Sequence, residues 1–283
     1  MSDSPAIAAA PDGTAFIRHT GADGASAEAR EGDRPAVVLI HGLGLCQRLF
    51  DPMIAGFSAH FDLISYDLYG HGDSGPPPQT ATLSLYSQQI AGLLDHLGIA
   101  RAALVGFSIG GMINRRFALD HPDRLSALAI WNSPHDRGEQ AQKLVEDRAA
   151  QVRAQGTMST LPAAIERWFT PGFRASQPGR VDLVRQWRQR VDLEGYAQTA
   201  WVLAGGVPEL VRPARAVTAP TLVMTAERDS GSTPAMAQAI AAEIPGARTE
   251  IVPDLQHLGL MEDPEAFAAP TLDFLKRTLC VEN

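Results

Sequence analysis

The sequence is poor in cysteine and in positive charge, and it has no long apolar run. Only two of the 283 residues are cysteines, Cys46 and Cys280, which is too few for a disulfide framework and shows no metal-ligand spacing. Lysine and arginine number 24 against 32 acidic residues, so the net charge is -8. Because phosphate binding needs a positive face, this balance argues against a nucleic-acid partner. No run reaches about 18 apolar residues, so no membrane-spanning helix is expected.

The beginning of the chain also lacks the features of a targeting segment. Residues 1–11 are small and acidic and have no basic stretch, so we expect no secretory signal. The two isolated cysteines fit a reducing compartment, and we therefore expect a cytoplasmic protein. Residues 20–34 are rich in Gly, Ala, Glu and Asp, and we expect them to form a surface turn.

What the sequence does contain is an alternation of short apolar runs with longer amphipathic stretches. Runs rich in aliphatic and β-branched residues are typical of strands buried on both faces of a parallel sheet. They lie at residues 36–41, 61–66, 102–107, 125–131, 221–225 and 249–252. Helix-like spacing occurs at residues 84–97, 109–120, 233–244 and 264–279. This order predicts a doubly wound, mostly parallel α/β domain.

One long interval breaks the alternation. Residues 135–212 contain no convincing strand but have helical patterns with many arginines and glutamines. The interval lies between two predicted strands, so we interpret it as an insertion rather than a terminal domain. The sequence therefore predicts a core domain made of residues 1–134 and 213–283, with a helical lid at residues 135–212.

A G-x-S-x-G motif at residues 106–110 carries the chemistry. It follows a predicted strand directly and opens a predicted helix, which is the context that a nucleophilic serine requires. Ser108 would lie in a sharp, strained turn, where bulky neighbours two residues away are excluded. The start of the following helix would direct its dipole and free N–H groups at the reaction centre. We predict that Ser108 is the nucleophile.

A serine hydroxyl needs a general base, and the base needs an orienting acid. With this motif the chain order is serine, acid, histidine. Asp229 and His257 follow the last two predicted strands, so both should reach the carboxyl edge of the sheet. Glu227 and Asp254 are rivals for the acid. An acid after the preceding strand is another known arrangement, but that position holds Asn132.

An oxyanion hole needs two backbone N–H groups aimed at the developing negative charge. We predict that one belongs to Ile109, the residue after the nucleophile, and the other to Leu43, in the glycine-rich loop after the first apolar run. His135, Trp131, Trp168 and Trp187 are predicted to line the substrate pocket. The interval 135–212 also offers cations for an acidic substrate: Arg167, Arg174, Arg188 and Arg190.

With these motifs the chain resembles the α/β-hydrolase superfamily from residue 36 to residue 279. The shared landmarks are HGLG, DLYGHGDS, GFSIGG, PTLV followed by an aspartate, and QHL before the final helix. Three further stretches, at residues 166–171, 194–197 and 244–248, are similar to the 3-oxoadipate enol-lactonase group. At residues 69–72 the chain reads Y-G-H-G where that group has R-G-H-G. The resemblance implies a hydrolase of an enol-lactone or related small ester in aromatic catabolism.

The sequence thus predicts a serine hydrolase that cleaves a small carboxylic ester or enol-lactone through an acyl-enzyme. No metal and no organic cofactor are expected, and the expected partner is a small-molecule substrate. A general carboxylesterase would share every catalytic residue, as would a cofactor-free perhydrolase or a C–C bond hydrolase. A non-catalytic ligand receptor on the same fold is the alternative from a different class. Monomer and homo-oligomer both stay open.

Overall fold

The computed structural model describes residues 6–19 and 34–279. The surface turn predicted at residues 20–34 lies almost entirely outside the described residues, and so does Cys280. Cys46 is described, and it is a buried free thiol.

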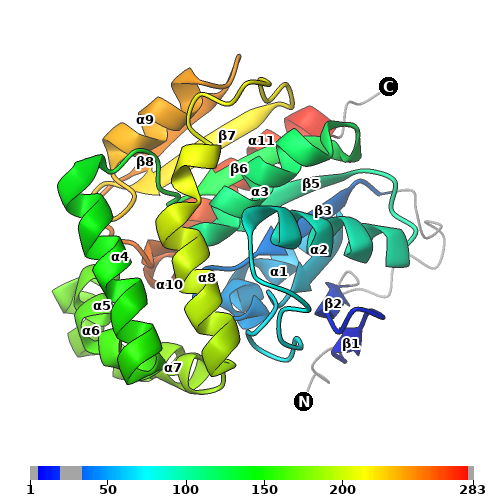
Figure 1. The fold of residues 1–283 in the computed structure, drawn as a ribbon. Helices are drawn as coiled ribbons and strands as arrows, with labels where there is room; N and C mark the ends of the chain where they lie inside the picture. Colours follow the sequence, from blue (N-terminus) through cyan, green and yellow to red (C-terminus); the bar gives the residue numbers. More distant parts are fainter. Residues whose placement is uncertain (1–5, 20–33, 280–283) are drawn as a thin grey trace.

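Within the described residues, eight strands form one sheet (Figure 1). The strand order is β1-β2-β4-β3-β5-β6-β7-β8, with β1 and β2 antiparallel to their neighbours and the other strands parallel. This confirms the predicted mostly parallel sheet. The strands are β1 (Ala8–Ala9), β2 (Ala15–His19), β3 (Ala36–Ile40), β4 (Asp62–Tyr66), β5 (Ala102–Phe107), β6 (Leu125–Trp131), β7 (Thr221–Ala226) and β8 (Arg248–Val252).

The central strands are apolar throughout because both of their faces are covered. In β3, Val38 and Ile40 belong to the apolar cluster on one side of the sheet, whereas Val37 and Leu39 belong to the cluster on the other side. Successive side chains of a strand point to opposite faces, so an uninterrupted apolar run supplies two cores at once.

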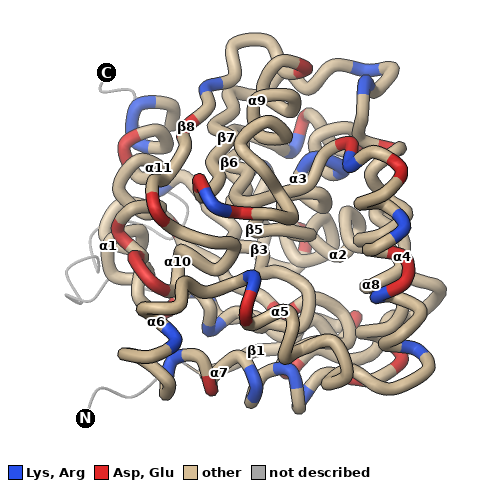
Figure 2. The backbone as a smooth tube through the Cα atoms, turned by 90° about the vertical axis from the view of Figure 1, so that its left-hand side faces the viewer, with Lys and Arg blue, Asp and Glu red and all other residues tan. Residues whose placement is uncertain are grey.

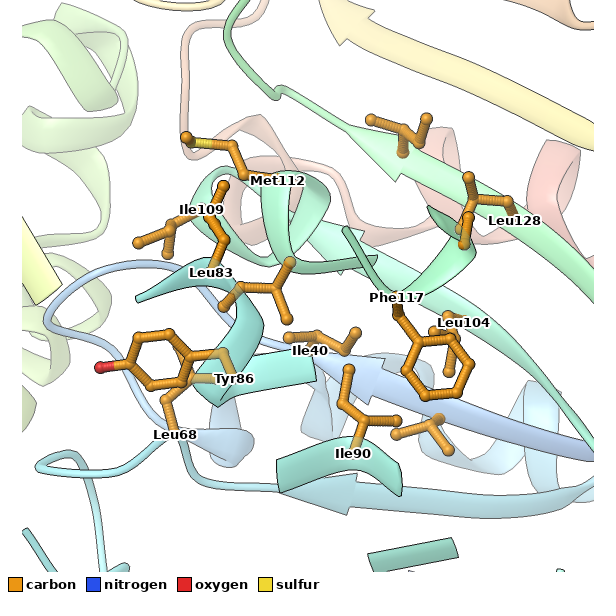
Figure 3. Packing of buried hydrophobic residues seen from close by; sticks show 14 of the residues in the cluster. Ile40, Leu68, Leu83, Tyr86, Ile90, Leu104, Ile109, Met112, Phe117 and Leu128 are labelled. Atoms are coloured by element: carbon orange, nitrogen blue, oxygen red, sulfur yellow. The ribbon is translucent and has the colours of Figure 1, made fainter. Parts of the chain in front are cut away.

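Helices on both faces complete the two cores. The first core packs α2 (Leu83–His96), α3 (Ile109–Asp120) and α9 (Pro234–Ala242) on the sheet. Figure 3 shows Ile90, Met112 and Phe117 meeting the strand residues Ile40 and Leu104 there. The second core lies under α1 (Ile54–Ser58) and α11 (Pro264–Leu279).

Local capping fixes where two of these helices begin. Thr233 accepts a hydrogen bond from the backbone N–H of Met236, and Pro234 occupies the first helical position of α9, as the sequence indicates. Thr82 caps α2 in the same way through the N–H of Leu85, so this helix begins one residue earlier than predicted. The remaining short helices are α10 (Gly259–Glu262), η1 (Gln47–Met53), η2 (Pro122–Arg124), η3 (Thr157–Thr160) and η4 (Val207–Glu209).

Between β6 and β7 the chain leaves the sheet and forms a group of helices at one end of the molecule (Figure 1). A small apolar cluster joins the long antiparallel neighbours α4 and α8, and Tyr86 of α2 meets Thr199 of α8 at 2.6 Å between hydroxyl oxygens. No helix of the described residues has the length and apolar character needed to cross a membrane. The inserted helices are α4 (Gly138–Gln155), α5 (Leu161–Trp168), α6 (Pro171–Ser176), α7 (Pro178–Gln189) and α8 (Leu193–Gly205).

Candidate active site

Ser108 occupies a strained turn between β5 and α3. Its φ of 58° and ψ of -115° lie outside the regions that ordinary residues favour. The turn is possible because its flanking positions have no side chains. A Cβ at Gly106 would lie 2.2 Å from the carbonyl oxygen of Gly110, and one at Gly110 would lie 2.4 Å from the carbonyl oxygen of Ile40. Both glycines of the motif are therefore required by packing.

His257 lies within hydrogen-bond distance of both predicted partners. Its Nε2 is 3.1 Å from the hydroxyl oxygen of Ser108, and its Nδ1 is 2.6 Å from Oδ2 of Asp229. The three side chains follow β5, β7 and β8 respectively, so the parallel sheet brings their loops to one edge. The imidazole is flanked by the rings of Phe107, 5.0 Å away between centroids, and Trp168, 6.2 Å away.

Asp229 is buried but well supplied with hydrogen-bond donors. Its Oδ2 accepts from Asn132 Nδ2 at 2.9 Å, and its Oδ1 accepts from the backbone N–H groups of Gly231 and Ser232. Burial alone would raise the pKa of this carboxyl, but the His257 charge and these hydrogen bonds outweigh burial and hold the pKa below its usual value. Asp229 is therefore an ionised acceptor, which puts the His257 proton on Nδ1 and leaves Nε2 free to accept from Ser108.

The two rival carboxylates lie elsewhere. Glu227 accepts from the backbone N–H of Asp254 at 3.0 Å, and Asp254 pairs with Arg228 on the surface. Both contacts join the loop after β7 to the turn after β8, and neither carboxylate is hydrogen-bonded to His257 in the described structure.

The glycine-rich loop after β3 comes directly beside the serine. A Cβ at Gly42 would lie 3.3 Å from the Cβ of Ser108. The Leu43 N–H of this loop makes no hydrogen bond within the described chain. Ile109 is the first residue of α3, so its N–H has no partner inside the helix. The two predicted oxyanion donors thus lie on backbone segments that border Ser108.

His41 fastens this loop to the strand beside it. Its Nε2 accepts from the backbone N–H of Leu68 at 3.0 Å, so the proton is on Nδ1, which donates to the carbonyl oxygen of Gly42 at 2.8 Å. Nε2 is 3.8 Å from Asp67, but an acceptor nitrogen forms no ion pair there. Complete burial lowers the pKa of His41 to about 4, which keeps the ring neutral.

A cavity of about 140 Å³ opens over the serine, between the sheet edge and the inserted helices. Ser108, His257 and Leu43 lie on its wall from the core side. The helices contribute apolar side chains together with four arginines: Arg137, Arg148, Arg167 and Arg188.

Residues 35–264 match the model of a family described as the alpha/beta hydrolase fold. The chain belongs to the α/β-hydrolase fold family. It is 30% identical to 3-oxoadipate enol-lactonase 2 of Acinetobacter baylyi, over 87% of this chain and 91% of that protein. The resemblance to enol-lactonases predicted from the sequence is therefore confirmed.

Two solved structures agree with this assignment. The enol-lactonase from Burkholderia xenovorans LB400 is 29% identical with a TM-score of 0.82, covering 96% of this chain and 100% of that one. A malate-bound thermophilic esterase from Thermogutta terrifontis is 25% identical with the same TM-score, covering 98% and 99%. The predicted α/β-hydrolase fold and the predicted class, a hydrolase that acts on ester bonds, are confirmed.

Of the four side chains predicted to line the pocket of this hydrolase, Trp168 lies on the cavity wall, and the structure places the other three elsewhere. Trp131 shares a strand face with Ala127 and Ala129, so it points into the core under α11, where its indole N–H donates to Thr271. His135 turns toward α9 and contacts Glu243 at 3.1 Å. Trp187 immediately precedes Arg188 on α7, and because successive helical residues diverge in direction, it packs into the second core instead.

The sequence reasoning missed two features of the site. Asn132 cannot serve as the acid, but it donates a hydrogen bond to Asp229, the predicted acid. The signal in the sequence is its position directly after the strand that pairs with β5. Arg137 and Arg148 were not singled out as pocket cations. Of the four arginines that were, Arg167 and Arg188 line the cavity, whereas Arg190 pairs with Asp73 on the surface and Arg174 lies outside the cavity wall.

Proposed function

We propose that this α/β-hydrolase cleaves a small carboxylic ester or lactone through a covalent acyl-enzyme on Ser108. The observation that carries the proposal is the continuous hydrogen-bonded chain from Ser108 through His257 to Asp229, located at the floor of a cavity. A hydroxyl, an imidazole and a carboxylate in this order supply a nucleophile, its base and the group that orients the base.

Acylation begins when Nε2 of His257 takes the hydroxyl proton as the Ser108 oxygen attacks the acyl carbon. Asp229 stabilises the imidazolium that forms, because its ionised carboxylate faces Nδ1. The bond from the acyl carbon to the leaving oxygen then breaks, and His257 returns the proton to that oxygen. The leaving group is an alcohol, an enol or, in a lactone, the other end of the same molecule.

Deacylation repeats the sequence with water. His257 removes a proton from water as it adds to the acyl carbon, the bond to Ser108 breaks, and the serine oxygen regains its proton. In both steps the Leu43 and Ile109 N–H groups are the proposed donors to the oxyanion, since both segments border Ser108. Donors fixed in place before the reaction stabilise the charge without reorganisation.

The relatives favour a lactone or a simple ester as substrate. The Acinetobacter baylyi relative and the Burkholderia xenovorans structure carry the name enol-lactonase, and the Thermogutta terrifontis structure is an esterase. Lactone hydrolysis in aromatic catabolism, in the cytoplasm, is the role that we propose. A general carboxylesterase is the second candidate, favoured by the likeness to the thermophilic esterase.

A panel assay tests the proposal. The wild type is expected to hydrolyse p-nitrophenyl acetate and at least one of γ-butyrolactone and an enol-lactone acid. Ser108→Ala should reduce kcat by several orders of magnitude. Ser87→Ala is the matched control, because Ser87 is a buried serine on α2 whose hydroxyl has no hydrogen-bond partner in the described structure. Undiminished turnover by Ser108→Ala would rule out the mechanism.

Trapping provides a second readout. The wild type mixed with p-nitrophenyl acetate should carry an acetyl group on the peptide that contains Ser108, and mass spectrometry detects it. Acetylation at another residue, with none on Ser108 under burst conditions, would contradict the acyl-enzyme.

A further inference from the structure

The arginines of the cavity have no carboxylate partner among residues 6–19 and 34–279. Arg137, Arg148, Arg167 and Arg188 all lie on its wall, and none has a carboxylate within 4.0 Å in the described structure. Asp229 also lies on this wall, but its carboxylate binds His257 and Asn132. A cavity with several positive charges and an engaged acid attracts anions.

Several arginines outside the cavity pair with carboxylates. Arg116 pairs with Asp120 and Glu209, and Arg153 pairs with Glu194. Figure 2 shows both signs of charge interspersed along the outer helices. Acidic residues outnumber basic ones in this chain, so carboxylates are available, and the cavity arginines nevertheless lack them.

Arg188 is the innermost of these cations. It is 1% exposed, and its guanidinium lies over the rings of Tyr196, at 4.4 Å, and Trp168, at 5.6 Å. Nη1 donates to the carbonyl oxygen of Thr157, while Nε has no partner in the described structure. Burial lowers the pKa of Arg188, because a charge without a counter-ion is costly in a dry site. A carboxylate in the cavity would relieve both deficits.

Arg137, Arg148 and Arg167 form a second, outer group, and all three are partly exposed. Burial lowers the pKa of Arg137 to about 10 and also lowers that of Arg167, and the charge of Arg148 lowers both further. The charge of Arg148 therefore repels both Arg137 and Arg167. Arg188 lies over the rings of Tyr196 and Trp168 instead, so we treat it as a positive centre separate from the outer group.

We infer that the substrate is a dianion: an ester or lactone that carries one carboxylate against Arg188 and a second anionic group between Arg137, Arg148 and Arg167. The inference rests on the proposed function, because it takes the cavity over Ser108 as the place of reaction. The cations would hold the two ends of the molecule, and the acyl carbon between them would lie over the serine.

Binding measurements separate this inference from catalysis. In Ser108→Ala, calorimetry compares α,ω-dicarboxylates from succinate to suberate with monocarboxylates of the same carbon number. At least one dicarboxylate should bind ten-fold or more tightly than its monocarboxylate. Arg148→Met and Arg188→Met, each in that background, should bring the two affinities within about three-fold. Arg185→Met is the matched control on α7, because Arg185 is exposed and lies outside the cavity wall.

Arg188 is buried, so Arg188→Lys provides a variant that keeps the charge and loses the planar fork. Its preference for dicarboxylates over monocarboxylates should fall between that of the Ser108→Ala parent and that of Arg188→Met in the same background. Arg148 is partly exposed, so Arg148→Met is expected to fold and provides the test even if both variants at position 188 unfold. The inference is overturned if dicarboxylates show no preference in the parent, or if the preference survives in Arg148→Met.

Turnover completes the test in the wild type. We compare γ-butyrolactone with the 3-carboxylate and the 2,3-dicarboxylate of the same ring by pH-stat. The dicarboxylate should have the highest kcat/KM, at least 100-fold above the neutral lactone, and Arg148→Met should lose most of this gain through KM. Ser108-dependent turnover of p-nitrophenyl acetate without any dianion preference would sink the inference alone. Tight dicarboxylate binding without turnover of any ester or lactone would instead sink the proposed function.

Discussion

Asn132 donates a hydrogen bond from Nδ2 to Oδ2 of Asp229, at 2.9 Å, and this is the oxygen that also faces His257. Asn132 follows β6 with a φ of 47°, a left-handed conformation that asparagine tolerates better than most residues. Its side chain therefore turns back toward the loop after β7. The strand between the proposed nucleophile and the proposed acid thus supplies a group that holds the Asp229 carboxylate in place.

Asn132→Ala should lower kcat about ten-fold with little change in KM. The substitution removes one donor from a buried carboxylate, so the pKa of Asp229 rises and its hold on His257 weakens. Steady-state kinetics with p-nitrophenyl acetate measure the effect. Asn114→Ala is the control, because Asn114 donates to the carbonyl oxygen of Ala129 in the core, away from the acid. Equal losses of kcat in both variants would mean that Asn132 has a structural role only.

Moving the carboxylate should restore part of the activity. Asp229→Asn alone should lower kcat by about 10⁴, as loss of the orienting acid does in serine hydrolases. Asn132→Asp combined with Asp229→Asn should recover at least ten-fold over the single variant. The reason is that position 132 already reaches the oxygen that faces His257. A double variant no more active than Asp229→Asn would show that the angle of approach from β6 is unproductive.

Gly44→Ala should disturb the cavity as well as the backbone. Gly44 has a φ of 73°, where any other residue costs about 1 kcal/mol, and a Cβ there would lie 2.1 Å from Nε of Arg188. We expect a lower melting temperature and a raised KM. Gly98→Ala has the same backbone cost, with a φ of 68° and no atom within 4 Å of the added carbon. The melting temperature should fall in both variants, whereas KM should rise in Gly44→Ala alone. An equal rise of KM in both variants would refute the clash with Arg188.

Stability should fall as the pH drops from about 6.5 toward 4. Burial lowers the pKa of His41 to about 4 and that of His71 to about 3, whereas both titrate at 6.5 in the unfolded chain. Between these values the unfolded state binds more protons, so the stability present above pH 6.5 is lost on acidification. From pH 7 to pH 5 each histidine should contribute a loss of about 2 kcal/mol.

Urea unfolding at a series of pH values measures this loss. His41→Gln should be less stable at pH 7.5 but should show a shallower pH dependence than the wild type, because one buried titrating ring is gone. His96→Gln is the control, since His96 is exposed and its removal leaves both buried rings in place. A wild type equally stable at pH 7 and pH 5 would contradict the prediction.

Local patterns predicted the elements well where one cause dominated. The apolar run of β3, the threonine–proline start of α9 and the limits of α3 and α11 follow from burial on two faces, from capping and from helical spacing. The short β1 and β2 have weaker patterns because they lie at the sheet edge and pair antiparallel. The aromatic residues that line the pocket were harder to predict, because the direction of each side chain decides whether it faces the pocket or the core. Trp131 follows the two-residue period of β6 and faces the core.

The sequence by itself determined the class of this protein, and it predicted the residues that we propose to react. Local geometry requires the glycines around Ser108, and strand order sets the order of Ser108, Asp229 and His257. Both features can be recognised along the chain. Only the tertiary structure decided what surrounds them. The hydrogen bond from Asn132 depends on which side chains converge from separate helices and strands, and so does the gathering of arginines that have no carboxylate partner among the described residues. Such convergence is set by packing across the fold rather than by neighbours in sequence.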